Sequence, residues 1–403
     1  MINSGDTAWI MIATALVVLM TPAVGLFYGG MVRKKSVLST LMMCFACLFL
    51  ISIQWILFGY TLAFGPSKAG LIGGLAWLGL RGVGQLPNVA YAATIPALCF
   101  MMFQAAFAII TPSLIVGAFV ERIKFASFLI FTGLWATFVY DPVAHWVWGV
   151  GGWLRNMGVL DFAGGTVVHI TAGFSALAIA LVIGKRLGYG KDNMEPSNIP
   201  LVVLGAVLLW FGWFGFNGGS SLGANGLAVQ AFVVTNISGA AAALVWMILS
   251  WLHRRPSVLG VATGAVVGLA AITPASGFVS PLAALAIGSI ASVISYYIIV
   301  LRMKLRIDES LDVFACHGMG SFWGVVATGI FANKAINAAG SNGLIHGNPG
   351  LVWTQLFGAA IVAVFAFVVT YAMATLIDLF VGLRVTENEE LVGLDISQHA
   401  ETI

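Results

Sequence analysis

The sequence predicts an all-α integral membrane protein with eleven transmembrane helices, and three observations support this fold class. Of its 403 residues, 60% are hydrophobic and 8% are charged, and the mean hydropathy is +1.01, whereas an average soluble domain carries about 25% charged residues. Eleven apolar stretches approach or exceed the length of roughly 20 residues that crosses a bilayer as a helix. The basic residues lie mainly in alternate connections, which fits an odd number of spans.

The eleven predicted helices follow one another along the whole chain. Basic clusters such as Arg33-Lys34-Lys35 and turn-forming runs such as Gly65-Pro66-Ser67 separate them. We expect residues 1–383 to form the transmembrane domain and residues 384–403 to form a cytoplasmic tail. The approximate limits of the helices are 7–28, 38–64, 94–119, 124–149, 163–184, 199–216, 227–252, 258–277, 280–301, 313–333 and 350–382.

The distribution of basic residues predicts the orientation. When the connections are assigned alternately to two sides, 14 of the 18 Lys and Arg residues fall on one side. Because basic residues gather on the cytoplasmic side, we expect the N-terminus outside and the C-terminus inside, in a multi-pass protein of the cell membrane. The net charge of +3 is small and no basic stripe is present, which excludes a nucleic-acid interface.

A short sequence pattern that occurs twice indicates an inverted repeat. Leu160-Asp161 leads into a helix that carries His169, and Leu311-Asp312 leads into a helix that carries His317. The first of these helices runs inward and the second runs outward. We therefore expect pseudo-twofold halves at about 7–186 and 199–334, with the long helix 350–382 outside the repeat. Such repeats place the substrate site at their interface.

Ionisable residues inside predicted helices are functional candidates, because a buried charge in a membrane is costly. The repeat would bring His169 and His317 toward one central region, and imidazole exchanges protons near neutral pH. Asp161 is expected to cap the fifth helix and also to stabilise a cation in an outer vestibule. Asp312 takes the same place before the tenth helix, with Asp308 and Glu309 as solvated neighbours.

The other histidines and the cysteines give no metal or cofactor site. His145 lies beside two tryptophans at the outer membrane edge, and three further histidines fall in connections or in the tail (His253, His346 and His399). We expect these four to be solvated or interfacial. The sequence offers no third metal ligand near His169 or His317. We expect the four cysteines to be core or lipid-facing thiols without a disulfide (Cys44, Cys47, Cys99 and Cys316). We predict no metal and no cofactor.

Four further residues would form a cation site if the fold brought them together. Phe107, Trp148 and Phe216 offer aromatic faces, each of which attracts a cation by about 0.5 to 2 kcal/mol. The hydroxyl of Ser220 can accept an N–H. Taken singly, each of these residues is more typical of a core or of a membrane-interface belt.

These residues stand in stretches that resemble the ammonium transporter family (Amt/Mep/Rh). The matching stretches are long and ordered along the whole chain: Gly117 to Arg122, His145 to Gly149, Asp161 to His169, Gly212 to Ser220, Asp312 to Gly318 and Gly382 to Val385. Because Trp148 and Ser220 are present, the chain is similar to the Amt branch rather than to the Rhesus branch.

The resemblance implies roles for individual residues. Phe107, Trp148 and Ser220 look like the outer ammonium recruitment site, with Asp161 as the buried carboxylate that supports it. Phe107 and Phe216 look like the stacked phenyl gate below this site. His169 and His317 look like the twin histidines of a hydrophobic pore.

The resemblance also implies an assembly and partners. The family fold is an eleven-helix protomer with its own pore, assembled as a homotrimer. The tail resembles the cytoplasmic segment that governs activity and helps to dock a trimeric PII-type regulator of nitrogen metabolism; its candidate residues are Arg384, Glu387, Gly393 and Asp395.

The expected mechanism starts from the similar size and equal charge of potassium and ammonium, since only ammonium can lose a proton. We predict recruitment as the cation, deprotonation near the gate and passage of ammonia, with or without the proton; methylammonium would be an analogue. The alternatives are a sensor that binds ammonium without transport, a neutral ammonia channel, and a secondary transporter of another small cation or a zwitterion. An enzyme is not expected, since no set of nucleophile, base and acid is present.

Overall fold

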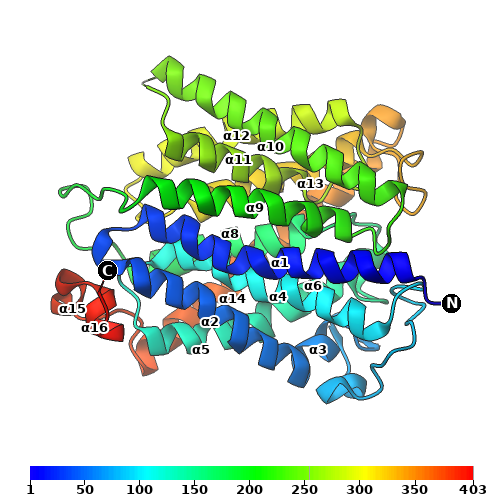
Figure 1. Cartoon of the computed structure of the whole chain (residues 1–403), viewed down its shortest axis with the longest axis horizontal. Coiled ribbons are helices and arrows are strands. Elements are labelled where there is room, and N and C mark those ends of the chain that lie inside the picture. Colours follow the sequence, from blue (N-terminus) through cyan, green and yellow to red (C-terminus); the bar gives the residue numbers. More distant parts are fainter. Residues whose placement is uncertain (254, 403) are drawn as a thin grey trace.

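The computed structural model describes residues 1–253 and 255–402. The chain forms a bundle whose long helices run roughly along one direction (Figure 1). Ten helical segments of the described residues are long and apolar enough to cross a membrane. They are α1 (Ser4–Met31), α2–η2–α3 (Val37–Gln54, Trp55–Gly59, Tyr60–Phe64), α4 (Ala97–Phe119), α5–η4–α6–α7 (Phe125–Trp135, Ala136–Tyr140, Asp141–Trp148, Trp153–Asn156), η5–α8 (Gly165–Ile170, Thr171–Ile183), α9 (Ile199–Gly219), α10 (Gly226–His253), α12 (Pro281–Lys304), η6–α13 (Phe314–Met319, Gly320–Phe331) and α14 (Gly350–Phe380).

The remaining apolar helix, α11 (Val258–Ile272), completes the eleven helices that the sequence predicts, but it is shorter than expected. The predicted helix reached residue 277, whereas residues 273–278 form turns around Pro274. A proline offers no backbone N–H to continue a helix. The turn is covered by protein, because Phe162 N donates to Pro274 O at 3.1 Å and a Cβ on Gly165 would lie 2.4 Å from the Pro274 ring. Irregular backbone is tolerated at such depth only when protein surrounds it.

The two histidine-bearing helices, η5–α8 and η6–α13, pass directly against each other. Both His169 and His317 lie on π-helical turns, η5 and η6, and such turns often mark functional sites. Gly173 of α8 lies against Gly318, so that a Cβ on Gly173 would be 2.2 Å from the Gly318 Cα. Only glycine allows this approach, which sets the spacing of the two histidines.

The two ends of the bundle differ in their short elements. We call the end that carries the N-terminus the outer end, following the charge bias, and the opposite end the inner end. The termini lie at opposite ends (Figure 1). The outer end holds the antiparallel pair β1 (Ser67–Lys68) and β2 (Ile72–Gly73), with η3 (Leu75–Leu80) and η7 (Leu344–His346); the inner end holds η1 (Lys34–Ser36) and the tail helices α15 (Glu387–Val392) and α16 (Leu394–His399).

Candidate functional site

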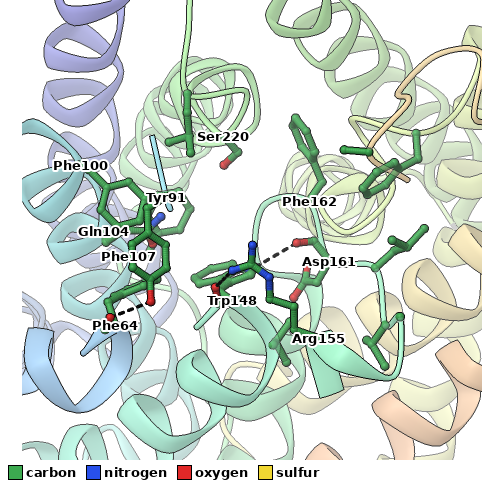
Figure 2. Close-up of a pocket in the computed structure, with 17 residues that line it drawn as sticks. Phe64, Tyr91, Phe100, Gln104, Phe107, Trp148, Arg155, Asp161, Phe162 and Ser220 are labelled. Carbon is green, nitrogen blue, oxygen red and sulfur yellow. Dashed lines mark hydrogen bonds between the residues drawn. The ribbon is translucent and has the colours of Figure 1, made fainter. Parts of the chain in front are cut away.

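A cavity of about 420 Å³ opens at the outer end, and we call it the outer cavity. The side chains that line it include Phe107 of α4, Trp148 of α6, Asp161 of the connection between α7 and η5, and Ser220 at the end of α9 (Figure 2). The fold therefore brings together the four residues that the resemblance implied for an outer recruitment site. Gln104, Tyr91 and Arg155 also line the cavity, and the sequence analysis did not single them out.

The floor of the outer cavity is aromatic. The ring centroid of Phe107 lies 5.9 Å from that of Trp148 and 4.4 Å from that of Phe216. Both phenylalanines are buried, with 1% and 0% of their surface exposed, so their rings close the cavity below. The Ser220 hydroxyl donates to Phe216 O at 2.8 Å, which leaves the lone pairs of its oxygen free to accept an N–H.

Below the phenylalanines lies a narrow passage, which we call the histidine passage. His169 Nδ1 and His317 Nδ1 are 3.2 Å apart, and the two buried rings are nearly parallel at 20°. One ring must donate and the other accept, so the two imidazoles take different tautomers. The space beside them is about 10 Å³ and is lined by apolar side chains such as Trp213, Ile110 and Leu114. This is close to the smallest space that admits one water-sized molecule.

The passage continues into an inner cavity of about 260 Å³. His317 lines both spaces, and Asp312, Cys316, Met31 and Met194 line the inner one. The outer cavity, the phenylalanine pair, the histidine passage and the inner cavity thus follow one another from the outer to the inner end.

Asp161 caps the fifth helix, as the sequence predicted. Its Oδ1 accepts from Gly164 N and Gly165 N at 2.8 Å, and its Oδ2 accepts from Thr166 N and Val167 N at 2.8 and 3.1 Å. Burial raises the pKa of Asp161, and the four N–H groups oppose this shift without reversing it. The carboxylate of Asp161 therefore faces the first turn of the helix. The backbone oxygen of the same residue accepts from the indole N–H of Trp148 at 2.9 Å.

The inner counterpart of Asp161 is Glu309, and the prediction that Asp312 takes this place is wrong. Glu309 precedes His317 by eight residues, as Asp161 precedes His169. Its carboxylate accepts from Val313 N and Phe314 N at 2.9 and 3.2 Å. Three residues after each carboxylate the backbone turns left-handed, at Gly164 (φ 115°) and at Asp312 (φ 60°).

The prediction that Asp308 and Glu309 are solvated is also wrong. Asp308 and Glu309 are 3% and 0% exposed, and Asp312 forms an ion pair with Arg302 at 2.7 Å. Burial raises the pKa of Glu309 to about 8, and the nearby charge of Asp312 acts in the same direction. A pattern match on Leu-Asp alone could not identify this register, because the capping residue is a glutamate three positions earlier.

His145 is also corrected, from an interfacial to a buried residue. It is 0% exposed, and its Nδ1 and Nε2 lie 2.9 and 2.8 Å from Ala63 O and Ser67 Oγ. It thus ties the fourth span to the end of the second. His253 and His346 are exposed, as predicted, whereas His399 is half-buried with its ring 4.9 Å from that of Phe125.

Within residues 1–253 and 255–402, no group of three or more His, Cys, Asp or Glu side chains is placed to hold a metal ion. The four cysteines are free, and three of them are buried.

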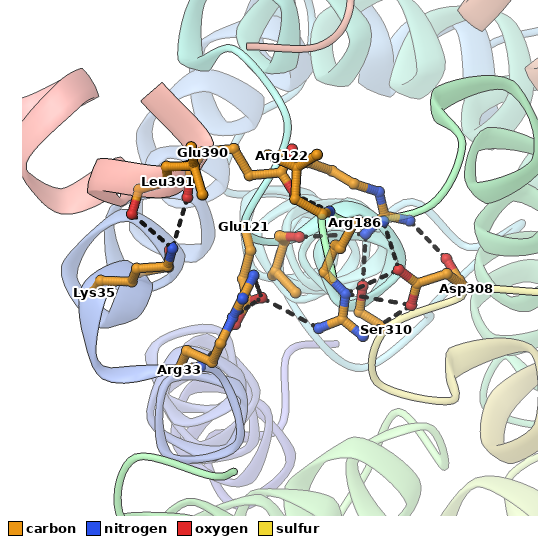
Figure 3. Close-up of polar contacts among 12 residues, drawn as sticks. Arg33, Lys35, Glu121, Arg122, Arg186, Asp308, Ser310, Glu390 and Leu391 are labelled. Carbon is orange, nitrogen blue, oxygen red and sulfur yellow. Dashed lines mark hydrogen bonds and ion pairs between the residues drawn. The ribbon is translucent and has the colours of Figure 1, made fainter. Parts of the chain in front are cut away.

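Four charged side chains from four connections meet at the inner end, and we call them the inner ion-pair cluster (Figure 3). Arg186 contacts Asp308 at 2.8 Å and Glu121 at 3.3 Å, and Arg33 contacts Glu121 at 2.7 Å. The hydrogen bonds and the charge of Arg186 outweigh the effect of burial and hold the pKa of Asp308 below its ordinary value. The sequence analysis counted these arginines only as markers of topology.

The tail packs on this end through charged and backbone contacts. Lys35 Nζ donates to Glu390 O and Leu391 O at 2.8 Å (Figure 3), and Arg384 pairs with the buried Glu390 at 2.7 Å. Asp395 Oδ1 accepts from Ser39 N at 2.7 Å.

Of the other predicted tail residues, Gly393 lies directly against Lys35, where a Cβ would be 2.5 Å from the Lys35 backbone oxygen. Glu387 is exposed in the first turn of α15. Sequence reasoning missed Glu390, whose side chain accepts from Leu187 N and pairs with Arg384, and whose backbone oxygen accepts from Lys35.

Comparison with known proteins gives consistent matches along the whole chain. The family profile described as Ammonium Transporter Family matches residues 8–403. The chain is 50% identical to ammonium transporter Amt1 of Archaeoglobus fulgidus over 99% of both chains, and 48% identical to an ammonium transporter of Bacillus subtilis over 98% of both chains. The crystal structure of Candida albicans Mep2 superposes with a TM-score of 0.91 at 36% identity, covering 96% of this chain and 88% of that one. A structure named Sensor Amt Protein has a TM-score of 0.91 at 29% identity, covering 98% of each chain.

Proposed function

This chain belongs to the ammonium transporter family, and we propose that it recruits ammonium as a cation in the outer cavity, removes a proton near the phenylalanine pair and passes ammonia through the histidine passage. Transport of ammonium across a membrane follows from the family itself. The route and its chemistry are the proposal.

Recruitment is supported by the composition of the outer cavity. Phe107 and Trp148 present aromatic rings to the space that a cation would occupy, and such faces attract a cation by about 0.5 to 2 kcal/mol. Ser220 offers an oxygen that can accept an N–H. Potassium shares the charge of ammonium, so this cavity alone separates the two ions poorly.

The observation that carries the proposal is the histidine pair in an apolar passage. Moving a bare ion into a low-dielectric space costs on the order of 20 kcal/mol in the idealised Born limit, whereas neutral ammonia avoids this cost. His169 and His317 lie 3.2 Å apart. The other side chains that line the passage are aliphatic, aromatic or thioether groups. They can hydrogen-bond ammonia and relay a proton, so selectivity for ammonium would arise from its loss of a proton.

A second candidate function is an ammonium sensor that binds without transport. The similarity to the structure named Sensor Amt Protein, at a TM-score of 0.91, favours it as the alternative. In a sensor, ammonium would bind in the outer cavity and act on a partner through the tail.

We further propose a homotrimer in the cell membrane, with a pore in each protomer and a cytoplasmic PII-type regulator that docks at the tail. The contacts of Arg384 with Ile183 O, of Gly393 with Lys35 and of Asp395 with Ser39 N support the tail as a surface held in one place. The mass of the purified protein in mild detergent tests the trimer directly.

The test of the transport mechanism is the current evoked by an ammonium pulse on proteoliposomes, with potassium as the comparison ion. We expect a saturable, ammonium-specific response in the wild type, and a reduced response or a gain of potassium current in His169→Ala and His317→Ala. His346→Ala, at an exposed histidine of the outer end, is the matched control.

The possible outcomes separate the candidate functions. Internal alkalinisation without current would indicate a neutral ammonia channel, and ammonium binding without either signal would indicate a sensor. Normal flux and selectivity in both histidine variants would refute the proposed role of the pair.

A further inference from the structure

The outer cavity has an unexpected charge at its mouth. Of the residues that line it, only Arg155 and Asp161 carry formal charges. Each carboxylate oxygen of Asp161 accepts two backbone N–H groups, and the residue is 8% exposed. Arg155 lies on the short outer helix α7 and is exposed. The charge that a cation meets on entering this cavity is therefore positive.

The guanidinium of Arg155 is held in place. Its Nη1 donates to Trp148 O at 2.6 Å, and the indole of Trp148 in turn donates to Asp161 O at 2.9 Å. Figure 2 shows the Arg155 side chain extending beside Trp148 toward Asp161. A guanidinium keeps its charge at every physiological pH. A fixed positive charge thus stands next to the aromatic residue that is proposed to bind ammonium.

The field of Arg155 reaches other residues of the cavity. Burial raises the pKa of Tyr91, while a hydrogen bond with Val150 N and the positive charge of Arg155 act in the opposite direction. Tyr91 belongs to the connection before α4, whereas Arg155 belongs to the connection after α6. Tyr91 and Arg155 thus border the cavity from two separate segments of the chain.

We propose that Arg155 is an affinity-determining residue of the outer cavity, whose fixed charge weakens the binding of ammonium there. This inference rests on the proposed recruitment of ammonium as a cation. Efficient conduction needs a site that attracts the ion but also releases it. The aromatic rings and Ser220 provide attraction, and Arg155 opposes it, so the half-saturating ammonium concentration is higher than the aromatic site alone would give.

The test compares half-saturating ammonium concentrations of proteoliposome currents at low ionic strength. Arg155→Gln removes the charge and keeps a hydrogen-bond donor, Arg155→Lys keeps both, and Arg155→Glu reverses the charge. For a charge several ångströms away in a water-like medium, we expect a decrease of about threefold for Gln and about tenfold for Glu. Arg155→Lys should match the wild type.

Two controls separate charge from structure. Arg81→Gln removes an exposed positive charge of the outer end that does not line the cavity, and it should leave the concentration unchanged. Added sodium chloride should reduce the effect of Arg155→Gln, because the screening length falls to about 8 Å at physiological ionic strength. A salt-independent effect would contradict a charge mechanism.

An unchanged or raised half-saturating concentration in Arg155→Gln would overturn the proposal. So would an equal change in Arg155→Lys, which would assign the effect to the Trp148 hydrogen bond instead. If the wild type gives neither current nor alkalinisation, the proposed function is wrong. The charge effect is then measured by isothermal titration of ammonium chloride into the same variants, where the same order of affinities is required.

Discussion

The outer and inner ends of the bundle share one backbone arrangement but differ in charge. At both ends a carboxylate eight residues before one of the paired histidines accepts backbone N–H groups, and a residue with a left-handed backbone follows three positions later. At the outer end this carboxylate, Asp161, is surrounded by an aromatic cavity. At the inner end lie all five side-chain ion pairs of the described residues, together with the docked tail.

This difference between the two ends shows that the outer cavity contains no carboxylate that is free to bind a cation. An unpaired carboxylate in the outer cavity would attract potassium and sodium as strongly as ammonium. The carboxylate oxygens of Asp161 instead accept backbone N–H groups, so the cavity presents aromatic faces and the Ser220 hydroxyl. At the inner end, the carboxylates pair with arginines from other connections and hold those connections together. The outer end thus carries an aromatic cavity, whereas the connections of the inner end are held together by ion pairs.

The largest expected effect comes from Asp161→Ala. This change leaves four backbone N–H groups without their acceptor, and each unsatisfied buried group costs about 1 to 3 kcal/mol. We expect a loss of ammonium current of more than about 100-fold and a clear decrease in apparent melting temperature. The measurements are proteoliposome currents and thermal unfolding in detergent.

Glu309→Ala is the matched variant at the inner end. Because Glu309 accepts two N–H groups rather than four, its apparent melting temperature should fall by about half as much. An equal or larger decrease for Glu309→Ala would break the comparison between the two ends.

The next largest effect is expected for Arg186→Met in the inner ion-pair cluster. This change leaves Asp308 and Glu121 buried without that partner, and breaking a buried pair costs about 3 to 5 kcal/mol. The melting temperature should fall, while the half-saturating ammonium concentration of any remaining current should stay at the wild-type value. Lys191→Met, at an exposed position of the same connection, should change neither quantity. A shifted ammonium affinity in Arg186→Met would show that the two ends are coupled.

A smaller effect concerns the pH dependence of stability. Glu309 has a raised pKa of about 8, so the folded protein binds more protons than the unfolded chain between roughly pH 4.5 and 8, and stability should fall as pH rises through this window. Asp308 has a lowered pKa, so its contribution is present at neutral pH and should be lost below about pH 4. The melting temperature, measured between about pH 4 and pH 8, should be highest near the acidic end of this range. In Glu309→Gln, the decrease in melting temperature toward pH 8 should become smaller. An unchanged decrease would exclude Glu309 as its source.

Much of the fold follows from the sequence, because length and hydropathy alone define membrane helices. Ten of the predicted spans agree closely with the described helices, and the error at α11 arises at Pro274, where the hydropathy stays high although the backbone turns. The convergence of Phe107, Trp148, Ser220 and Asp161 on one cavity also agrees with the expectation from the resemblance.

The errors concern residues whose partners lie far away in the sequence. Asp308 and Glu309 were expected to be solvated neighbours of Asp312. Both are buried, because Asp308 pairs with Arg186 and Glu309 accepts backbone N–H groups. The two tryptophans beside His145 predict an interfacial residue, yet its hydrogen-bond partners lie at the end of the second span and in the turn after it. Hydropathy describes the environment of a segment and carries no information about such pairs.

The smallest expected effect is that of Asp395→Ala in the tail. Its side chain accepts one hydrogen bond, from Ser39 N, so the loss should be about 1 kcal/mol, while Arg384 and Glu390 still hold the preceding helix. Hydrogen exchange should therefore quicken in residues 394–400 and stay unchanged in residues 387–391, with no change in the ammonium affinity of the outer cavity. Glu387→Ala, at an exposed position, is the control and should alter neither segment. If both segments exchange faster in Asp395→Ala, the tail is released as one unit, and the inner end depends on this single contact rather than on its ion pairs.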